Sequence, residues 1–102
     1  MNRDMRISIK SGVKLNGVKP ETVVGMLIAQ ETFDPYDFVI TSVCDGKHSK
    51  NSLHYSGNAF DCRTRHLTES QTQLVVLQLK KNLGDEFDVV LEKTHCHIEY
   101  QP

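Results

Sequence analysis

Histidine and aspartate residues lie at two places in the sequence where their spacing suits metal chemistry. His54 and Asp61 are separated by YSGNAF, and Gly57 in this segment permits a tight bend that brings both ends to one point. His95 and His97 are expected on a strand, where alternation puts both on the same face, with their Cβ atoms roughly 6–7 Å apart. Two neutral imidazoles and one carboxylate make a set typical of catalytic zinc, with a fourth position for water. One histidine of the pair could then bind the metal while the other faces a substrate atom, and the metal would lower the pKa of its water toward about 7.

Each of these residues also has an ordinary structural interpretation. A His–Asp pair is more often a surface or capping interaction than a metal site, and an H-x-H on a strand can be an exposed face. The spacing alone therefore leaves metal binding and these structural roles open. Cys62 and Cys96 could be ligands too. Each lies beside a better-placed candidate in an alternating segment, so we expect both to be small buried apolar residues.

The elements that position these residues are predicted from hydrophobic periodicity and turn residues. We expect strands at 6–10, 38–43, 87–91 and 95–100, a helix at 20–32, and a second helix that follows a capping box at Thr68 and Gln71 and ends at Gly84. The expected core-facing residues of the two helices are Val23, Val24, Leu27, Ile28, Leu74, Val75, Leu77 and Leu79. Residues 44–65 are polar and are expected to form an active-site loop. This order predicts an α+β domain, with a small antiparallel sheet and helices packed on one side.

The composition excludes several classes of protein. The 102 residues suffice for one domain, and we expect residues 1–102 to form it. Twelve basic and thirteen acidic residues give a net charge of −1, without the basic excess typical of proteins that bind nucleic acids or anionic membranes. No apolar run approaches the roughly 20 residues that span a bilayer, and none follows the charged start, so we expect cytoplasmic synthesis without a secretory signal. The odd number of cysteines, three, and the absence of C-x-x-C argue against a disulfide framework and a four-cysteine zinc site.

One segment matches the pattern S-x-H-x-x-G-x-A-x-D at every fixed position, and these positions are Ser52, His54, Gly57, Ala59 and Asp61. The pattern resembles that of the zinc D-Ala-D-Ala peptidases, which share a fold with the hedgehog signalling domain and a metal-site design with lysostaphin-type peptidases. The later H-x-H, followed by Ile98 and Glu99, resembles the second half of the same signature. The resemblance covers about residues 38–100 and is strongest to the phage-encoded type.

The resemblance implies a role for each matching residue. His54, Asp61 and His97 would be the zinc ligands, and His95 would be the catalytic neighbour that handles a proton or steadies the oxyanion. Ser52 and Gly57 would shape the loop, with Ser52 also a substrate-binding candidate, and Ala59 would pack beneath the metal. For Ser52, Gly57 and Ala59, simple roles as a cap, a turn glycine and a core residue are the stronger alternatives.

The sequence departs from the family pattern at two places. Many members carry an arginine just after the strand equivalent to residues 38–43, whereas here the cation must come from Lys47, His48 or Arg63. Arg63 is our first choice for a substrate carboxylate, because its planar fork suits bidentate contact. Several relatives also have a carboxylate where this chain has Thr94. Glu92 is a weak alternative as the base, and a role as an exposed strand residue is the simpler expectation.

The resemblance implies a zinc metallopeptidase with one Zn²⁺ per chain and a hedgehog-like fold. Its substrate would be a D-amino-acid-containing peptide bond of bacterial peptidoglycan, cleaved during phage lysis or wall entry, after release from the cell or as part of a virion. Carboxypeptidase and endopeptidase action both stay open, as does the oligomeric state. One alternative is a non-catalytic phage structural or wall-binding domain that keeps the zinc, and another is the same fold without a metal. No nucleic-acid or membrane partner is expected.

Overall fold

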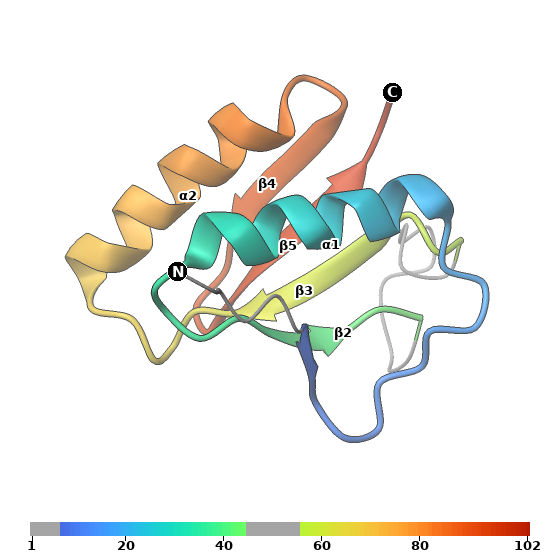
Figure 1. Ribbon diagram of the computed structural model, residues 1–102, viewed down its shortest axis with the longest axis horizontal. Helices are drawn as coiled ribbons and strands as arrows, with labels where there is room; N and C mark the ends of the chain where they lie inside the picture. Colours follow the sequence, from blue (N-terminus) through green and yellow to red (C-terminus); the bar gives the residue numbers. More distant parts are fainter. Residues whose placement is uncertain (1–6, 45–55) are drawn as a thin grey trace, which may run out of the picture.

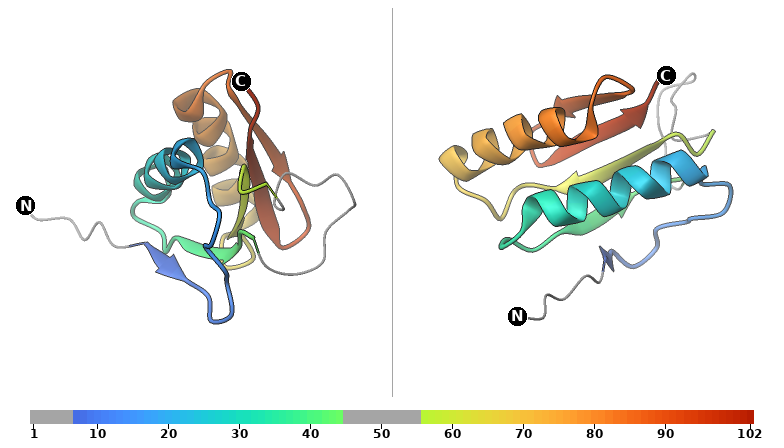
Figure 2. Two further views of the ribbon diagram at one scale, coloured as in Figure 1. Left: turned by 90° about the vertical axis from the view of Figure 1, so that its right-hand side faces the viewer. Right: turned by 45° about the horizontal axis from the view of Figure 1, so that its top comes forward.

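The computed structural model describes residues 7–44 and 56–102, which form a five-stranded sheet and two helices (Figure 1). The elements along the chain are β1 (Ser8–Ile9), α1 (Pro20–Phe33), β2 (Val39–Ser42), β3 (Ala59–Arg63), α2 (Glu69–Leu83), β4 (Phe87–Leu91) and β5 (His95–Tyr100). The strand order is β1-β2-β3-β5-β4. Both helices lie on the same side of the sheet (Figure 2). The predicted α+β class, with helices on one side, is confirmed.

The sheet is mixed, so the prediction of an antiparallel sheet is wrong at one edge. β1 pairs with β2 in parallel, whereas every other neighbouring pair is antiparallel. The chain passes from β1 to β2 through α1, and a helical crossover of this kind joins parallel strands. This pairing fixes the segment that follows β1, because the Lys10 amide donates to the Ile40 carbonyl at 2.9 Å.

Strand β3 was not predicted, because residues 44–65 were expected to form a loop. It lies between β2 and β5, where its backbone bonds to both neighbours. Phe60 and Cys62 are fully buried toward the helices. Burial and pairing in a central position override the weak strand propensity of AFDCR. The strand replaces the expected loop at Asp61, so this candidate ligand has a rigid backbone.

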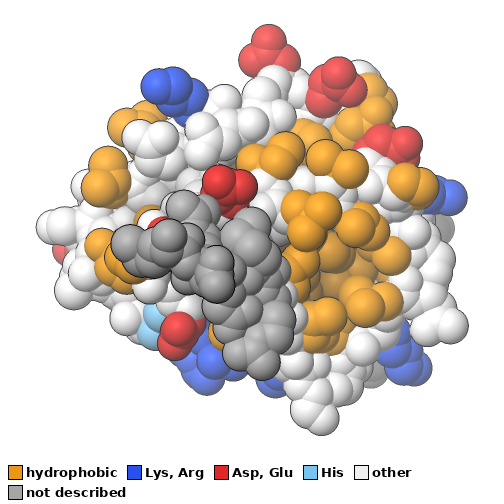
Figure 3. All heavy atoms as spheres, in the orientation of Figure 1, with side chains coloured by type: hydrophobic (Ala, Val, Ile, Leu, Met, Phe, Trp, Pro, Cys, Tyr) orange, Lys and Arg blue, Asp and Glu red, His pale blue; other side chains and the backbone are white. Residues whose placement is uncertain are grey.

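The buried face of α1 differs from the predicted one. Thr22, Gly25, Met26, Ala29 and Phe33 are among the residues that face the core. The expected core residues Val23, Val24 and Leu27 are 38%, 53% and 49% exposed. A small residue lets the helix approach its neighbours closely at one point, because a Cβ at Gly25 would lie 2.7 Å from the Phe87 ring. Apolar side chains consequently gather on the helical face of the molecule (Figure 3).

Helix α2 begins and ends as predicted. Thr68 and Gln71 form a reciprocal capping box, and Gly84 adopts a φ of 81° immediately after the helix. Val75 and Leu79 are buried as expected, but Leu74 and Leu77 are 58% and 63% exposed, so their predicted inward orientation is wrong. No helix in the described part of the chain is long and apolar enough to cross a bilayer.

The core lies between the helices and the sheet and leaves the opposite sheet face for other side chains. Its largest fully buried members include Phe33, Ile40, Phe60, Leu79 and Ile98. Cys62 and Cys96 are also fully buried there, as predicted. Because side chains alternate along β3 and β5, the residues between these core positions project from the face without helices.

Candidate metal and substrate site

Strands β3 and β5 bring the candidate chemical residues together on one sheet face. In their antiparallel register Asp61 is opposite His97, and Arg63 is opposite His95. Directly opposed residues on antiparallel strands project to the same face with their Cβ atoms about 4.5–5.5 Å apart. The expectation that His95 and His97 share a face is therefore confirmed.

Asp61 lies between the two histidines. His97 Nδ1 is 2.9 Å from Asp61 Oδ1, and His95 Nε2 is 3.8 Å from Asp61 Oδ2. The other ring nitrogen of His97 is 2.7 Å from Glu99 Oε1. Asp61 is only 8% exposed, so its carboxylate is largely withdrawn from water. The result is a chain of side chains from Asp61 through His97 to Glu99, with His95 beside it.

The two carboxylates favour the protonated form of His97. The hydrogen bond with Asp61 is the largest cause that raises the pKa of His97, and the bond with Glu99 adds to it, whereas burial opposes both. The pKa rises from 6.5 to about 9. At neutral pH and without a metal, His97 is therefore an imidazolium between two carboxylates.

The types of donor in this cluster fit zinc, which binds histidine nitrogen and carboxylate oxygen. The Nδ1–Oδ1 distance of 2.9 Å is shorter than the separation of about 3.4 Å between two such ligands on a tetrahedral zinc. A small displacement would thus let a cation replace the proton between Asp61 and His97. Glu99 would then hold the second ring nitrogen, as carboxylates commonly do for zinc-binding histidines.

The third predicted ligand, His54, lies outside the described residues, and so do Lys47, His48 and Ser52. Within the described ranges no group of three His, Cys, Asp or Glu side chains is arranged to hold a metal. The described part of the chain thus contributes two of the three predicted ligands. They lie in contact with one another.

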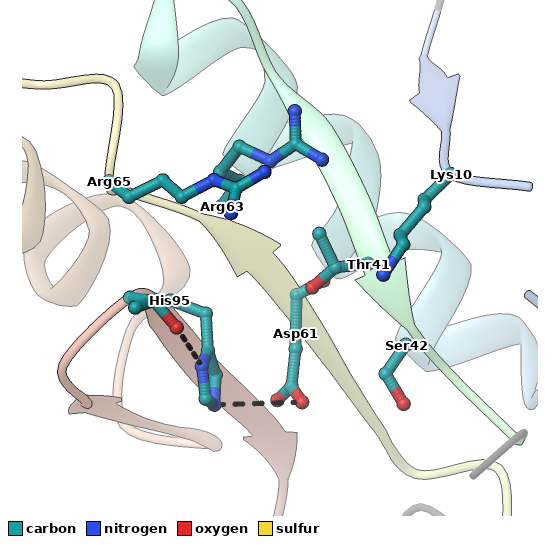
Figure 4. A pocket seen from close by; sticks show the side chains of 8 residues that line it. Lys10, Thr41, Ser42, Asp61, Arg63, Arg65 and His95 are labelled. Carbon is teal, nitrogen blue, oxygen red and sulfur yellow. Dashed lines mark hydrogen bonds and ion pairs between the residues drawn. The ribbon is translucent and has the colours of Figure 1, made fainter.

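His95 borders a cavity of ≈270 Å³ that opens beside Asp61 (Figure 4). Its Nε2 points toward Asp61, and its Nδ1 lies 3.4 Å from the Thr94 hydroxyl. Its side chain is 35% exposed, more than the 20% of His97. His95 is consequently the histidine of the pair that a ligand in the cavity could reach.

The remaining wall of this cavity is basic and hydroxylated. Arg63 was predicted as a substrate-binding residue, and it lines the cavity. Lys10, Arg65, Thr41 and Ser42 also line it and were not predicted. In Figure 4 Arg63 and Arg65 lie on one side of the cavity, and Lys10 extends from another.

The other sequence candidates among the described residues do not line this cavity. Ala59 is fully buried and lies opposite Glu99. Gly57 adopts a φ of 77°, and its carbonyl accepts hydrogen bonds from the Lys19 amide and the Thr22 hydroxyl. Glu92 lines a different cavity of ≈380 Å³. Cys62 is an unreactive core thiol, because its hydrogen bond with Cys96 and its burial raise its pKa.

Glu99 was missed as a functional candidate, although the sequence contains a signal for it. The period of two along a strand puts residues 95, 97 and 99 on one face. Gln101 donates a hydrogen bond to its second carboxylate oxygen. Glu99 is thus held in place from both sides.

Comparison with protein-family models, with curated proteins and with solved structures finds no match to this chain.

Proposed function

We propose that this protein is a zinc metallopeptidase that hydrolyses a D-amino-acid-containing peptide bond of bacterial peptidoglycan. The observation that carries the proposal is the contact between Asp61 and His97, two ligand candidates separated by 35 intervening positions in the sequence. Their contact, with His95 alongside, supports the proposal, because the signature implies that Asp61 and His97 bind one zinc and that His95 is their neighbour. A hedgehog-like fold is part of the same proposal, and the α+β architecture supports it.

In this proposal Asp61 and His97 hold the zinc together with His54. When bound, the zinc supplies a Lewis acid that polarises a carbonyl and lowers the pKa of a bound water. Glu99 fixes the orientation of the His97 ring through Nε2. One Zn²⁺ per chain is expected.

We assign His95 as the proton-handling group. It lies at the border of the cavity, with Nε2 near Asp61 and Nδ1 near the Thr94 hydroxyl. Contact with the hydroxyl orients the ring, while exposure of the side chain leaves it within reach of a substrate. His95 would accept or deliver a proton at the reacting centre, or steady the oxyanion.

The direct test is digestion of purified peptidoglycan by the zinc-loaded protein, followed by mass spectrometry of the fragments. We expect fragments that end at one D-amino-acid-containing bond, and loss of this activity after chelation with recovery on zinc addition. The masses also distinguish carboxypeptidase from endopeptidase products. Phage lysis or wall entry is the setting that we propose for this reaction.

A second candidate function is a non-catalytic zinc-containing phage structural or wall-binding domain of the same fold. Thr94 favours it, because several relatives of the proposed family have a carboxylate at this position, and Glu92 lines another cavity. Zinc bound in a stoichiometric amount without any released fragment would support this second candidate over the enzyme.

A further inference from the structure

We propose that Lys10, Arg63 and Arg65 form a carboxylate-binding subsite beside Asp61. This subsite would hold a free carboxylate of the substrate while the neighbouring peptide bond is cleaved. The identity of the substrate rests on the proposed function. The subsite itself rests on the cavity and its charges.

The three cations come from separate parts of the chain and meet around one cavity. Lys10 directly follows β1, Arg63 ends β3, and Arg65 lies two residues beyond it. All three line the ≈270 Å³ cavity, as do the side chains of Thr41 and Ser42 on β2. The strand order β1-β2-β3 produces this arrangement, because it leaves only β2 between the end of β1 and β3.

The charges around the cavity favour an anion. Asp61 is the one carboxylate among the described residues that line it. Its Oδ1 is already paired with His97 at 2.9 Å, so much of its negative charge is offset. Three cations therefore surround a space that has no other described acidic group in its wall.

The geometry of these cations suits a carboxylate. A guanidinium presents a planar fork of donors that matches a carboxylate in two hydrogen bonds, and an ammonium adds a compact point charge. In Figure 4 Arg63 and Arg65 approach from one side and Lys10 from another, with Asp61 and His95 along the remaining edge. A carboxylate held by these cations would place the adjoining part of the ligand near Asp61 and His95.

The subsite can be tested with a minimal ligand that has one free carboxylate beside a single amide bond. N-acetyl-D-alanine is titrated into zinc-loaded protein while the arginine side-chain Nε–H signals are followed by NMR. We expect the Arg63 and Arg65 signals to shift, and N-acetyl-D-alanine amide, which lacks the carboxylate, to leave them unchanged. Binding should weaken as salt is added, because the cations are at least partly exposed.

Variants assign the binding to these residues. Lys10→Gln and Arg65→Gln should each weaken the affinity about tenfold. Lys81→Gln, which removes an exposed cation from α2, should leave the affinity unchanged. Equal shifts with the acid and the amide, or equal affinity in all three variants, would overturn the proposal. Tighter binding of inorganic phosphate than of N-acetyl-D-alanine would overturn the assignment to a carboxylate.

The result is separable from the proposed peptidase activity. If N-acetyl-D-alanine binds at the three cations but peptidoglycan is not cleaved, the subsite stands and the enzyme proposal fails. If peptidoglycan is cleaved but the probe does not shift Arg63 and Arg65, the enzyme proposal stands and the subsite is overturned.

Discussion

Asp61 and His97 are directly opposed residues of two antiparallel strands, and their side chains are joined at 2.9 Å on the sheet face that the helices leave uncovered. A pair held this way moves little, since its backbone positions are fixed by the β3–β5 ladder. A metal that binds here would join two central strands and so stabilise the sheet as well as supply chemistry.

The first prediction concerns His95. His95→Ala should keep near-stoichiometric zinc and a near-native melting temperature, because the side chain is partly exposed and is 3.8 Å from Asp61. Peptidoglycan cleavage should fall roughly 10²–10⁴-fold, the usual range for a positioned general acid or base. Zinc content, melting temperature and cleavage rate are measured on the same preparation. If His95→Ala empties the metal site, the roles that we assign to His95 and His97 are reversed.

The second prediction concerns Glu99, which we assign as a positioning residue. Glu99→Ala should weaken zinc affinity about 10–100-fold, the usual cost of losing a carboxylate partner of a metal-binding histidine. Glu99→Gln should recover part of this loss, because its amide oxygen can still accept from His97 Nε2. Glu92→Gln is the matched control, since Glu92 lines another cavity. Competition with a zinc-binding dye measures the zinc affinity of the three variants. Equal affinities in Glu99→Ala and Glu92→Gln would refute the role of Glu99 as a positioning residue.

The third prediction is a loss of stability at high pH in the zinc-free protein. The pKa of His97 is about 9 in the folded state, whereas an ordinary histidine has a pKa of 6.5. The charged form of His97 therefore contributes to the free energy of unfolding, and this contribution is fully present below about pH 6.5 and is lost as the pH rises through about 9. The contribution is at most about 3 kcal/mol. Urea unfolding at pH 6, 8 and 10 measures it.

Asp61→Asn is the control for this pH dependence, because it removes the carboxylate that most raises the pKa of His97. The variant should lose less stability between pH 6 and 10 than the wild type. NMR titration of His97 should give a midpoint near 9 in the wild type and a lower one in the variant. An ordinary midpoint in the wild type would contradict the paired geometry.

The fourth prediction separates backbone strain from steric contact at glycine. Gly12 and Gly57 both have positive φ, but a Cβ at Gly12 would meet nothing within 4 Å, whereas one at Gly57 would lie 2.0 Å from the Gly17 carbonyl oxygen. Gly12→Ala should therefore cost about 1 kcal/mol from the left-handed conformation alone. Gly57→Ala should cost several kcal/mol more, measured by urea unfolding. Equal costs would show that the two chain segments do not approach this closely.

The sequence predicts the parts of the site that depend on local geometry. The shared face of His95 and His97 follows from the two-residue period of a strand, which needs no tertiary information. The ends of α2 were equally predictable, because the capping box and Gly84 act within one turn of the helix.

The rest depends on packing between distant segments. Strand β3 has few residues with high strand propensity, and its two neighbours in the sheet stabilise it. Helix α1 is apolar on more than one side, so its periodicity could not show that Gly25 and Ala29 face the core. Lys10 joins Asp61 only because β1 adds to the sheet beside β2, which depends on the order of the strands. Arg65 lies near Asp61 because it follows β3, the strand that was not predicted.

The zinc content of the wild type and of His97→Ala tests the central claim most directly. Both proteins are expressed with added zinc, purified without chelator and analysed for metal per chain. We predict one zinc in the wild type and close to none in His97→Ala, because the variant removes the nitrogen that faces Asp61. A wild type with well below one zinc, or a variant that keeps its full zinc, would contradict the account.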